Sequence, residues 1–557
     1  MKSKILFLLL VVALLTACGA PQTATPAPAQ PTAAPAEPTT TPQTEYVEVL
    51  RLPSGGDWGF PSPFGFNRGP GYTRASYLFD TLLWRDSSGT IPWLATEWSS
   101  SEDGKTWTFT LRENVQWHDG QPLTAADVVF SVQYYQKMGA SWFLSPVGEI
   151  ESATAPAPNQ VVLTLKRPFA PFIQTIAETM FILPKHIWEK VDDPKTYREK
   201  DATIGSGPYL LVEYNQAEGA YLFEANPDFF LGVPYVRRLE FVPTSDNLLA
   251  LQNGKIGAFD KFGGVNAEML KPFEQAPYQI KTAGGEWGTF LYFNLSFEGS
   301  PVQNVQVRQA IASSINRQEI VERILLGFGG AGSAGFLPPA NPYFKSSLPE
   351  YALDAEKAQS LLAEAGYTGD AQTGWKDAQG SPLTLSVAYS TSTNPRLIEM
   401  LESSLKAVGI AVQLQGMDQA TLDAAAQEGN YEVLLVGFGG LGGDPNLLSR
   451  NFASFSKMQG FSRARGYANP DFDALAKQEV GVLNPSARAE LIGQMQELLA
   501  ADLPALALYY TDRVVVFNAE VFDNWYFTPG GYGGGIPQPY NKHQYVIGVP
   551  TGTEIRK

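Results

Sequence analysis

The residues whose types and spacing best suit ligand binding lie in a glycine-rich stretch in the last third of the chain. Residues 431–449 read YEVLLVGFGGLGGDPNLLS, an apolar run typical of a buried strand, then glycines, then Asp444-Pro445 and an apolar helix start. A carboxylate here can bind a polar ligand group, or it can cap the helix that follows. Phe438 in this stretch, with Trp58 and Trp287 elsewhere, can stack on a flat ligand face or pack in the core.

The sequence contains no catalytic motif in the context that the motif requires. Residues 330–335 fit the pattern G-x-G-x-x-G, but a dinucleotide site needs a strand before this loop and a helix after it. A helix is expected before it, and residues 336–339 (FLPP) follow. The sequence around Ser333 does not match the nucleophile elbow of hydrolases, G-x-S-x-G, because Ala331 occupies the first position of that motif. HExxH, P-loop and CxxC motifs do not occur. We therefore expect neither catalytic residues nor a cofactor.

Composition excludes further classes of function. The net charge is −16, and no dense Lys/Arg cluster offsets it, which argues against a nucleic-acid partner. Three histidines and one cysteine in 557 residues leave few soft ligands, so no metal site is expected. After the N-terminus no apolar run reaches the roughly 18 residues of a spanning helix.

The N-terminus has the pattern of a secretory signal. Lys2 and Lys4 precede an apolar run over residues 5–15, which predicts a signal peptide over 1–17. The sequence LTACG at 15–19 resembles a bacterial lipobox, in which Cys18 would become the first residue and carry a diacylglycerol. Residues 18–44 are rich in Pro, Ala and Thr and predict a disordered tether. We therefore expect a lipid anchor on the outer face of the cell membrane, on the periplasmic side.

The elements expected after the tether alternate between strands and helices. Trp107, Phe109 and Leu111 alternate with polar residues, which predicts a half-buried strand. Residues 119–120 (DG) favour a turn, and Thr124 with Asp127 predicts a capped helix start. Strands at 383–389 and 410–415 flank a helix over 396–408, which indicates a βαβ-like run. The class is α/β.

Residues 107–128 also resemble a known signature. The strand at 107–112, the WHDG turn at 117–120 and the TAADV helix start at 124–128 are similar to the phrase of family 5 extracytoplasmic solute-binding proteins. These are the oligopeptide- and dipeptide-binding components of ABC importers. The resemblance continues over about 45–520, including GSGPY at 205–209 and VRQAI at 307–311.

The resemblance implies a bilobal periplasmic-binding-protein type II-like fold with mixed β-sheets and a hinge between lobes. Lobe I would span 45–285, with an extra subdomain over about 85–200. Lobe II would span 286–515, and 516–557 would return to lobe I. The ligand would bind in the cleft between lobes, with the loop of Asp57 and Trp58 at its mouth.

The resemblance also bears on the ligand. In peptide-binding members the glycine-rich loop carries an aspartate that binds the peptide α-ammonium, and Leu441 stands at that position here. A charged hydrogen bond contributes about 1.5–3 kcal/mol, so its loss argues against an ordinary free-amino peptide. Oligosaccharide-binding members use aromatic platforms instead, for which Trp58, Trp287 and Phe438 are candidates. Asp57, Leu441 and Asp444 complete the predicted ligand site.

The expected function is capture of a small extracytoplasmic solute by a monomer that delivers it to ABC permease subunits. Peptide is the default ligand of the family, and an oligosaccharide is the alternative. A second class is a lipid-anchored surface glycosidase, which would need two carboxylates about 5–9.5 Å apart in the cleft. A third hypothesis is a surface sensor or chaperone that uses the same fold without transport.

Overall fold

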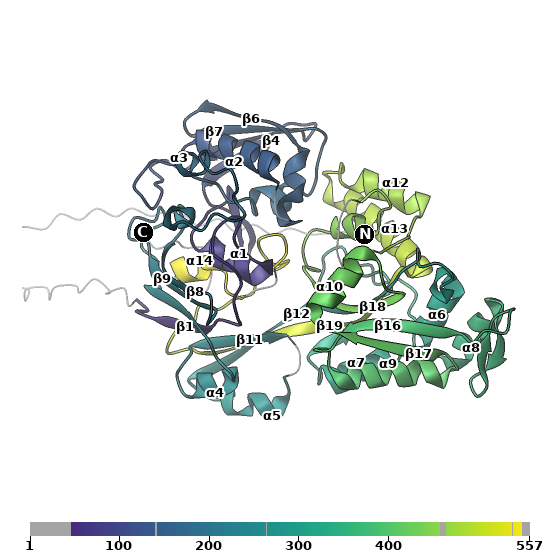
Figure 1. Cartoon of the computed structure of the whole chain (residues 1–557). Helices are drawn as coiled ribbons and strands as arrows, with labels where there is room; N and C mark the ends of the chain where they lie inside the picture. Colours follow the sequence, from purple (N-terminus) through teal and green to yellow (C-terminus); the bar gives the residue numbers. More distant parts are fainter. Residues whose placement is uncertain (1–45, 140–141, 263–264, 457–463, 537–538, 548–557) are drawn as a thin grey trace, which may run out of the picture. The chain divides into compact units, whose positions relative to one another are not determined.

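The computed structural model describes residues 46–139, 142–262, 265–456, 464–536 and 539–547 (Figure 1). The predicted signal peptide, the tether and Cys18 lie outside these residues. In the described part of the chain, no helix combines the length and the apolar character needed to cross a membrane.

One four-stranded sheet has the order β1 (Leu50–Pro53), β10 (Arg238–Val242), β9 (Ala220–Ala225) and β8 (Tyr209–Asn215). β1 pairs in parallel with β10, with Leu50 opposite Leu239. Leu239 and Phe241 of β10 alternate with half-buried residues, so one face of the sheet meets the core. Helix α1 (Arg68–Ser76) is buried against the same hydrophobic cluster.

A second four-stranded sheet has the order β4 (Ala95–Ser100), β5 (Thr106–Leu111), β7 (Gln160–Leu165) and β6 (Ile150–Ala157). The predicted strand is confirmed as β5, with Phe109 and Leu111 buried. The predicted helix start is confirmed as that of α2 (Ala125–Met138), where the Asp127 carboxylate accepts a 2.8 Å hydrogen bond from the Thr124 N–H.

The largest sheet has seven strands, six of them in the order β11 (Ala258–Phe262), β19 (Ala505–Asn518), β12 (Tyr278–Phe293), β18 (Val433–Gly439), β16 (Thr384–Ser390) and β17 (Ala411–Met417). β12 and β19 are long antiparallel partners that run between β11 and β18 (Figure 1). β16 and β17 are parallel and flank α9 (Pro395–Ala407), which confirms the predicted βαβ run.

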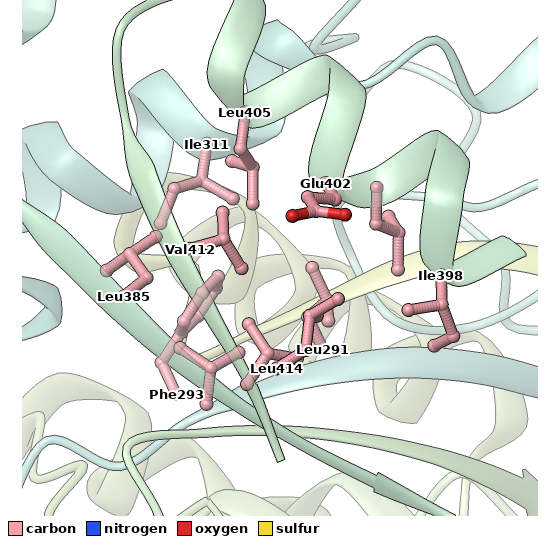
Figure 2. Close-up of a pocket in the computed structure, with 12 residues that line it drawn as sticks. Leu291, Phe293, Ile311, Leu385, Ile398, Glu402, Leu405, Val412 and Leu414 are labelled. Carbon is pink, nitrogen blue, oxygen red and sulfur yellow. The ribbon is translucent and has the colours of Figure 1, made fainter. Parts of the chain in front are cut away.

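Strands β12, β18, β16 and β17 pack against α9 without leaving room for a ligand. Leu291 and Phe293 of β12 face apolar side chains of α9, β16 and β17 (Figure 2). The remaining void is about 10 Å³, close to the least space that can hold one water molecule. Glu402 at its margin pairs with Lys406 at 2.6 Å. This region is core.

The last described helix, α14 (Lys542–Ile547), inserts into the core of the first sheet. Lys542 is fully buried and its ammonium lies 2.5 Å from the Asp80 carboxylate. Asn541 accepts a 2.7 Å hydrogen bond from the Trp84 indole N–H. Burial lowers the pKa of Lys542, and Asp80 opposes that shift by favouring the ammonium form.

Two apolar stretches with helical spacing do not form long helices. Residues 74–84 contain the end of α1 and then the start of β2 (Leu83–Asp86), because Leu83 and Trp84 pair with β3 (Gly89–Pro92). Residues 168–183 contain one π-helical turn, η2 (Ile173–Ala177). In both cases tertiary pairing and packing override an apolar run that alone cannot separate strand from helix.

The remaining elements are helices and short strands from both halves of the chain. They are α3 (Lys185–Trp188), α4 (Asn247–Gln252), α5 (Ala267–Leu270), α6 (Val305–Ser314), α7 (Arg317–Ile324), α8 (Ala355–Glu364), α10 (Gln419–Glu428), α11 (Leu447–Phe452), α12 (Pro470–Glu479), α13 (Pro485–Asp502), β13 (Gly329–Ala331), β14 (Thr368–Asp370), β15 (Gly374–Lys376), η1 (Trp142–Glu149), η3 (Lys200–Thr203), η4 (Lys271–Phe273) and η5 (Pro301–Gln303). The described residues from Tyr46 onward belong to one compact unit, and the division into lobes at 285/286 stays a prediction.

Candidate functional site: a cavity beside strands β12 and β19

A cavity of about 290 Å³ lies where segments distant in sequence meet. It is lined by charged, glycine and aromatic residues, namely Arg85, Gln174, Ala283, Gly284, Glu286, Ala340, Pro342, Tyr343, Gly442, Gly443, Asp444, Arg513, Phe527, Thr528, Pro529 and Gly530. A larger surface hollow of about 520 Å³ is lined, apart from Asp119, by the single stretch 186–204. We take the first cavity as the candidate site because it combines a half-buried acid, Glu286, with walls from both halves of the chain.

A β-bulge places the acid in this cavity. The pairing of β12 with β19 shifts register between Ala283 and Trp287. Gly285 inside the bulge has a φ of +52°, a left-handed conformation that glycine adopts without steric cost. Bulges re-aim side chains, and the Glu286 carboxylate here accepts a 2.9 Å hydrogen bond from the Gly530 N–H.

The electrostatic environment of Glu286 is unusual. Burial raises the pKa of its carboxyl to about 7, because the charged form loses hydration. The Gly530 N–H, and then Arg513 and Arg85, act in the opposite direction without cancelling this effect. Glu286 therefore titrates near neutral pH, which is typical of functional sites but also of buried structural acids.

Both arginines of the cavity have acidic partners. Arg85 lies 3.4 Å from the Glu178 carboxylate and donates a 3.1 Å hydrogen bond from Nε to the Pro529 carbonyl. Arg513 pairs with Asp260 across β19 and β11. The guanidinium charges are thus offset locally, and they also hold the segment around Pro529 and the β11 edge in place.

Asp444, a predicted ligand residue, lines the cavity but is held by Arg488. The two guanidinium nitrogens Nη1 and Nη2 lie 2.8 and 2.6 Å from its carboxylate oxygens, in a bidentate pair. Its carboxylate also accepts a 2.8 Å hydrogen bond from the Asn446 N–H at the start of α11. Both side chains are buried. In this structure Asp444 fixes the loop.

Leu441, also predicted for the ligand site, points away from the cavity. Its side chain is fully buried in the hydrophobic cluster of β18, α11 and α13. Its backbone N–H donates a 3.2 Å hydrogen bond to the Glu286 carbonyl, and its carbonyl accepts one of 2.6 Å from the Asn341 side chain. The loop backbone therefore positions Glu286, while the leucine side chain anchors the loop.

The predicted aromatic platforms lie outside the lining of the cavity. Trp287 is 37% exposed, and its indole lies over the flat backbone of Gly437 and Gly439, where a Cβ would come within 3 Å of it. Phe438 is half-buried, 6.3 Å from the ring of Phe336. Trp58 donates a 2.9 Å hydrogen bond from its indole to the Ser54 carbonyl.

Asp57 also lies outside the cavity lining and is engaged in a local network. Its carboxylate accepts hydrogen bonds from the Tyr214 hydroxyl at 2.7 Å and the Gly59 N–H at 2.9 Å. Partial burial acts to raise the pKa of Asp57, but hydrogen bonds from Tyr214, Gly59 and Tyr221 outweigh it and lower the pKa. The ligand roles of Asp57, Trp58, Trp287, Phe438 and Leu441 stay predictions.

Sequence reasoning missed Glu286, Arg85 and Arg513. A signal existed for the first, since two consecutive glycines inside a strand pattern favour a bulge. Within the residues that the structure describes, no group of three or more His, Cys, Asp or Glu side chains is arranged to hold a metal ion.

The chain is similar over most of its length to known solute-binding proteins. The chain is 26% identical over 523 residues to the dipeptide-binding protein of Escherichia coli K12, a match that covers 87% of this chain and 92% of that protein. It is 25% identical over 462 residues to the nickel-binding periplasmic protein of the same organism, covering 80% and 86%. These relatives differ in the solute they are named for.

The fold matches solved structures over nearly its whole length. It is similar to the oligopeptide-binding protein AppA of Bacillus subtilis in complex with a nonapeptide, with a TM-score of 0.73, 21% identity, and coverage of 90% of this chain and 99% of that one. Residues 89–460, more than half of the chain, match the family described as "Bacterial extracellular solute-binding proteins, family 5 Middle". The chain belongs to the family 5 bacterial extracellular solute-binding proteins.

Proposed function

We propose that the protein is the substrate-binding component of an ABC importer, and that it binds a small solute in the cavity beside β12 and β19 and delivers it to the permease. The observation that carries this proposal is the cavity itself, walled by Arg85 and Gln174 from one half of the chain and by residues 442–444 from the other. Binding between such segments suits capture and release, because relative motion of the walls opens the site.

A short peptide is the solute we favour. The relatives named for dipeptides and oligopeptides support this choice. The cavity, at about 290 Å³, lies at the lower end of the usual range for small-molecule sites, so a di- or tripeptide fits better than a long one in this conformation.

An oligosaccharide is the second candidate. It is favoured by Leu441, whose apolar side chain replaces an acid, and by Trp287, which is partly exposed. A thermal-shift screen of the purified protein against dipeptides to pentapeptides and oligosaccharides separates the two. A solute at 100 times its Kd raises the free energy of unfolding by about 2.7 kcal/mol, which shifts the midpoint measurably.

We further propose that the protein is a monomer that performs no catalysis and is held on the outer face of the membrane through lipid on Cys18. Metabolic labelling with palmitate should modify the wild-type chain and not Cys18→Ser. Incubation with chromogenic glycosides should give no product, and turnover would instead support the glycosidase alternative. Failure of every solute class to shift the midpoint would count against solute capture.

A further inference from the structure

We propose that Glu286 is the acidic anchor of the site and binds a cationic group of the solute, an ammonium or a guanidinium. This inference rests on the proposed function and names the residue that replaces the acid missing at Leu441. It also reverses the expectation drawn from Leu441 alone, because an acid is still present next to the same loop.

The geometry brings Glu286 to the loop that lacks an acid. The Leu441 N–H donates to the Glu286 carbonyl, so the two backbones are hydrogen-bonded neighbours. The Glu286 carboxylate lies directly over Gly442, where a Cβ would come within 2.6 Å of Oε1. The acid thus reaches the glycine-rich loop from the bulge of β12 rather than from the loop's own sequence.

The carboxylate has capacity for a ligand. Among the described contacts it accepts one hydrogen bond, from the Gly530 N–H. An ionised carboxylate offers about four acceptor positions. Glycines at 284, 442, 443 and 530 surround it, so no bulky side chain from these positions blocks an approaching ammonium.

The groups that face Glu286 favour a cation. Two arginines line the cavity near Glu286, and each has an acidic partner. The positive charge of Arg85 on β2 is offset by Glu178, and that of Arg513 on β19 is offset by Asp260. Asp512, next to Arg513, has its pKa raised by burial, with a hydrogen bond from Gly285 acting against that shift.

The glycine-rich loop adds no free positive charge. Its acid, Asp444, is paired with Arg488, which also lies 2.8 Å from the buried Glu479. Arg513 and Arg85 favour the ionised form of Glu286 only in part, because burial still raises its pKa to about 7, and a solute cation would stabilise the ionised form further. Tyr343 and Phe527 supply apolar wall for the rest of the solute.

The proposal carries a pH dependence. Burial raises the pKa of Glu286 to about 7, and a cation binds its ionised form. Affinity for a cationic solute should therefore fall as pH decreases through 7 toward 5. Affinity for a neutral solute should change little over the same interval.

The test is isothermal titration calorimetry of the full chain at pH 7.5 with three probes: Ala-Phe, N-acetyl-Ala-Phe and cellobiose. Acetylation removes the ammonium and keeps the rest of the dipeptide. We expect the wild type to bind Ala-Phe at least tenfold more tightly than its acetylated form, the effect of one charged hydrogen bond. Glu286→Gln should abolish this preference, while Glu402→Gln on α9 should retain it.

A second pair of variants covers the case in which Glu286→Gln does not fold. Gly442→Ala places a methyl group against the Glu286 carboxylate and should reduce the preference for Ala-Phe. Gly443→Ala is the matched control, since its methyl group would meet the Gly440 carbonyl at 3.2 Å and not Glu286. It should keep the preference.

Each contrary outcome has a distinct meaning. Retention of the preference in Glu286→Gln or Gly442→Ala would overturn the role of Glu286. Wild-type binding of cellobiose without binding of Ala-Phe would also overturn it, yet leave solute capture standing. Binding of no probe, with no peptide or oligosaccharide hit in the thermal-shift screen, would refute the proposed function and this inference together.

Discussion

The middle and the C-terminal end of strand β12 have opposite properties. Residues 290–293 pair with β18 in unbroken register, residues 290–292 also pair with β19, and all four are fully or almost fully buried, with a void of about 10 Å³ beneath them. Residues 284–286 leave the pairing with β19 in a bulge, contain two glycines and lie beside a cavity of about 290 Å³. Pairing on both sides makes a core with no room for ligand, whereas the glycine-containing bulge in the same strand makes a site.

The largest expected effect breaks the regular end. Phe293→Ala removes a fully buried ring from the core under α9. Such truncations cost about 3–5 kcal/mol through lost burial and the cavity left behind. Urea denaturation should show this loss. Because residue 293 lies away from the cavity lining, the affinity for any solute found should change less than threefold.

The next effect concerns the loop that faces the bulge. Asp444→Ala leaves Arg488 buried beside Glu479 without its bidentate partner. Breaking a buried pair costs about 3 kcal/mol or more. Arg488→Met should cost more than Asp444→Ala, because it leaves both Asp444 and Glu479 buried without their cation, whereas Asp444→Ala keeps the pair of Arg488 with Glu479. Urea denaturation measures both losses, and an Asp444→Ala variant as stable as the wild type would show that the pair does not hold the loop.

A third effect follows from the titration of Glu286. Its folded-state pKa, about 7, is above the unfolded value of roughly 4.3, so the folded state binds the proton more tightly. Stability from this group is complete below pH 4 and decreases as pH rises through 7. Glu286→Gln should flatten that part of the stability profile. At pH 8 it should be more stable than the wild type by about 1–3 kcal/mol.

The smallest effect tests the bulge itself. Gly285→Ala puts a side chain in a left-handed conformation, which costs about 1–2 kcal/mol. Thermal denaturation should show a modest decrease in midpoint, with Gly284→Ala as control, because Gly284 is not in that conformation. Equal losses in both variants would mean that the conformation of the bulge is not what the substitution disturbs.

Several individual strands and helices were predictable from sequence, whereas of the residues that line the cavity only Asp444 was predicted as a site residue. β5, α2, and the β16-α9-β17 unit follow from periodicity and capping, which are local. The cavity depends on bringing Arg85, Glu286, Arg513 and Gly530 together, and no local pattern encodes that approach. Leu441 was predicted as a ligand residue from its place in the glycine-rich loop, but its apolar side chain turns to the core.

The buried contacts of α14 have a consequence for the order in which this protein acquires structure. Lys542 and Asn541 complete the polar interior around Asp80 and Trp84, more than 450 positions earlier in the chain. The ribosome therefore has to finish almost the whole polypeptide before the earliest segments can reach their final packing. A chain that stops before residue 541 should stay susceptible to proteases even though most of its elements have already been synthesised.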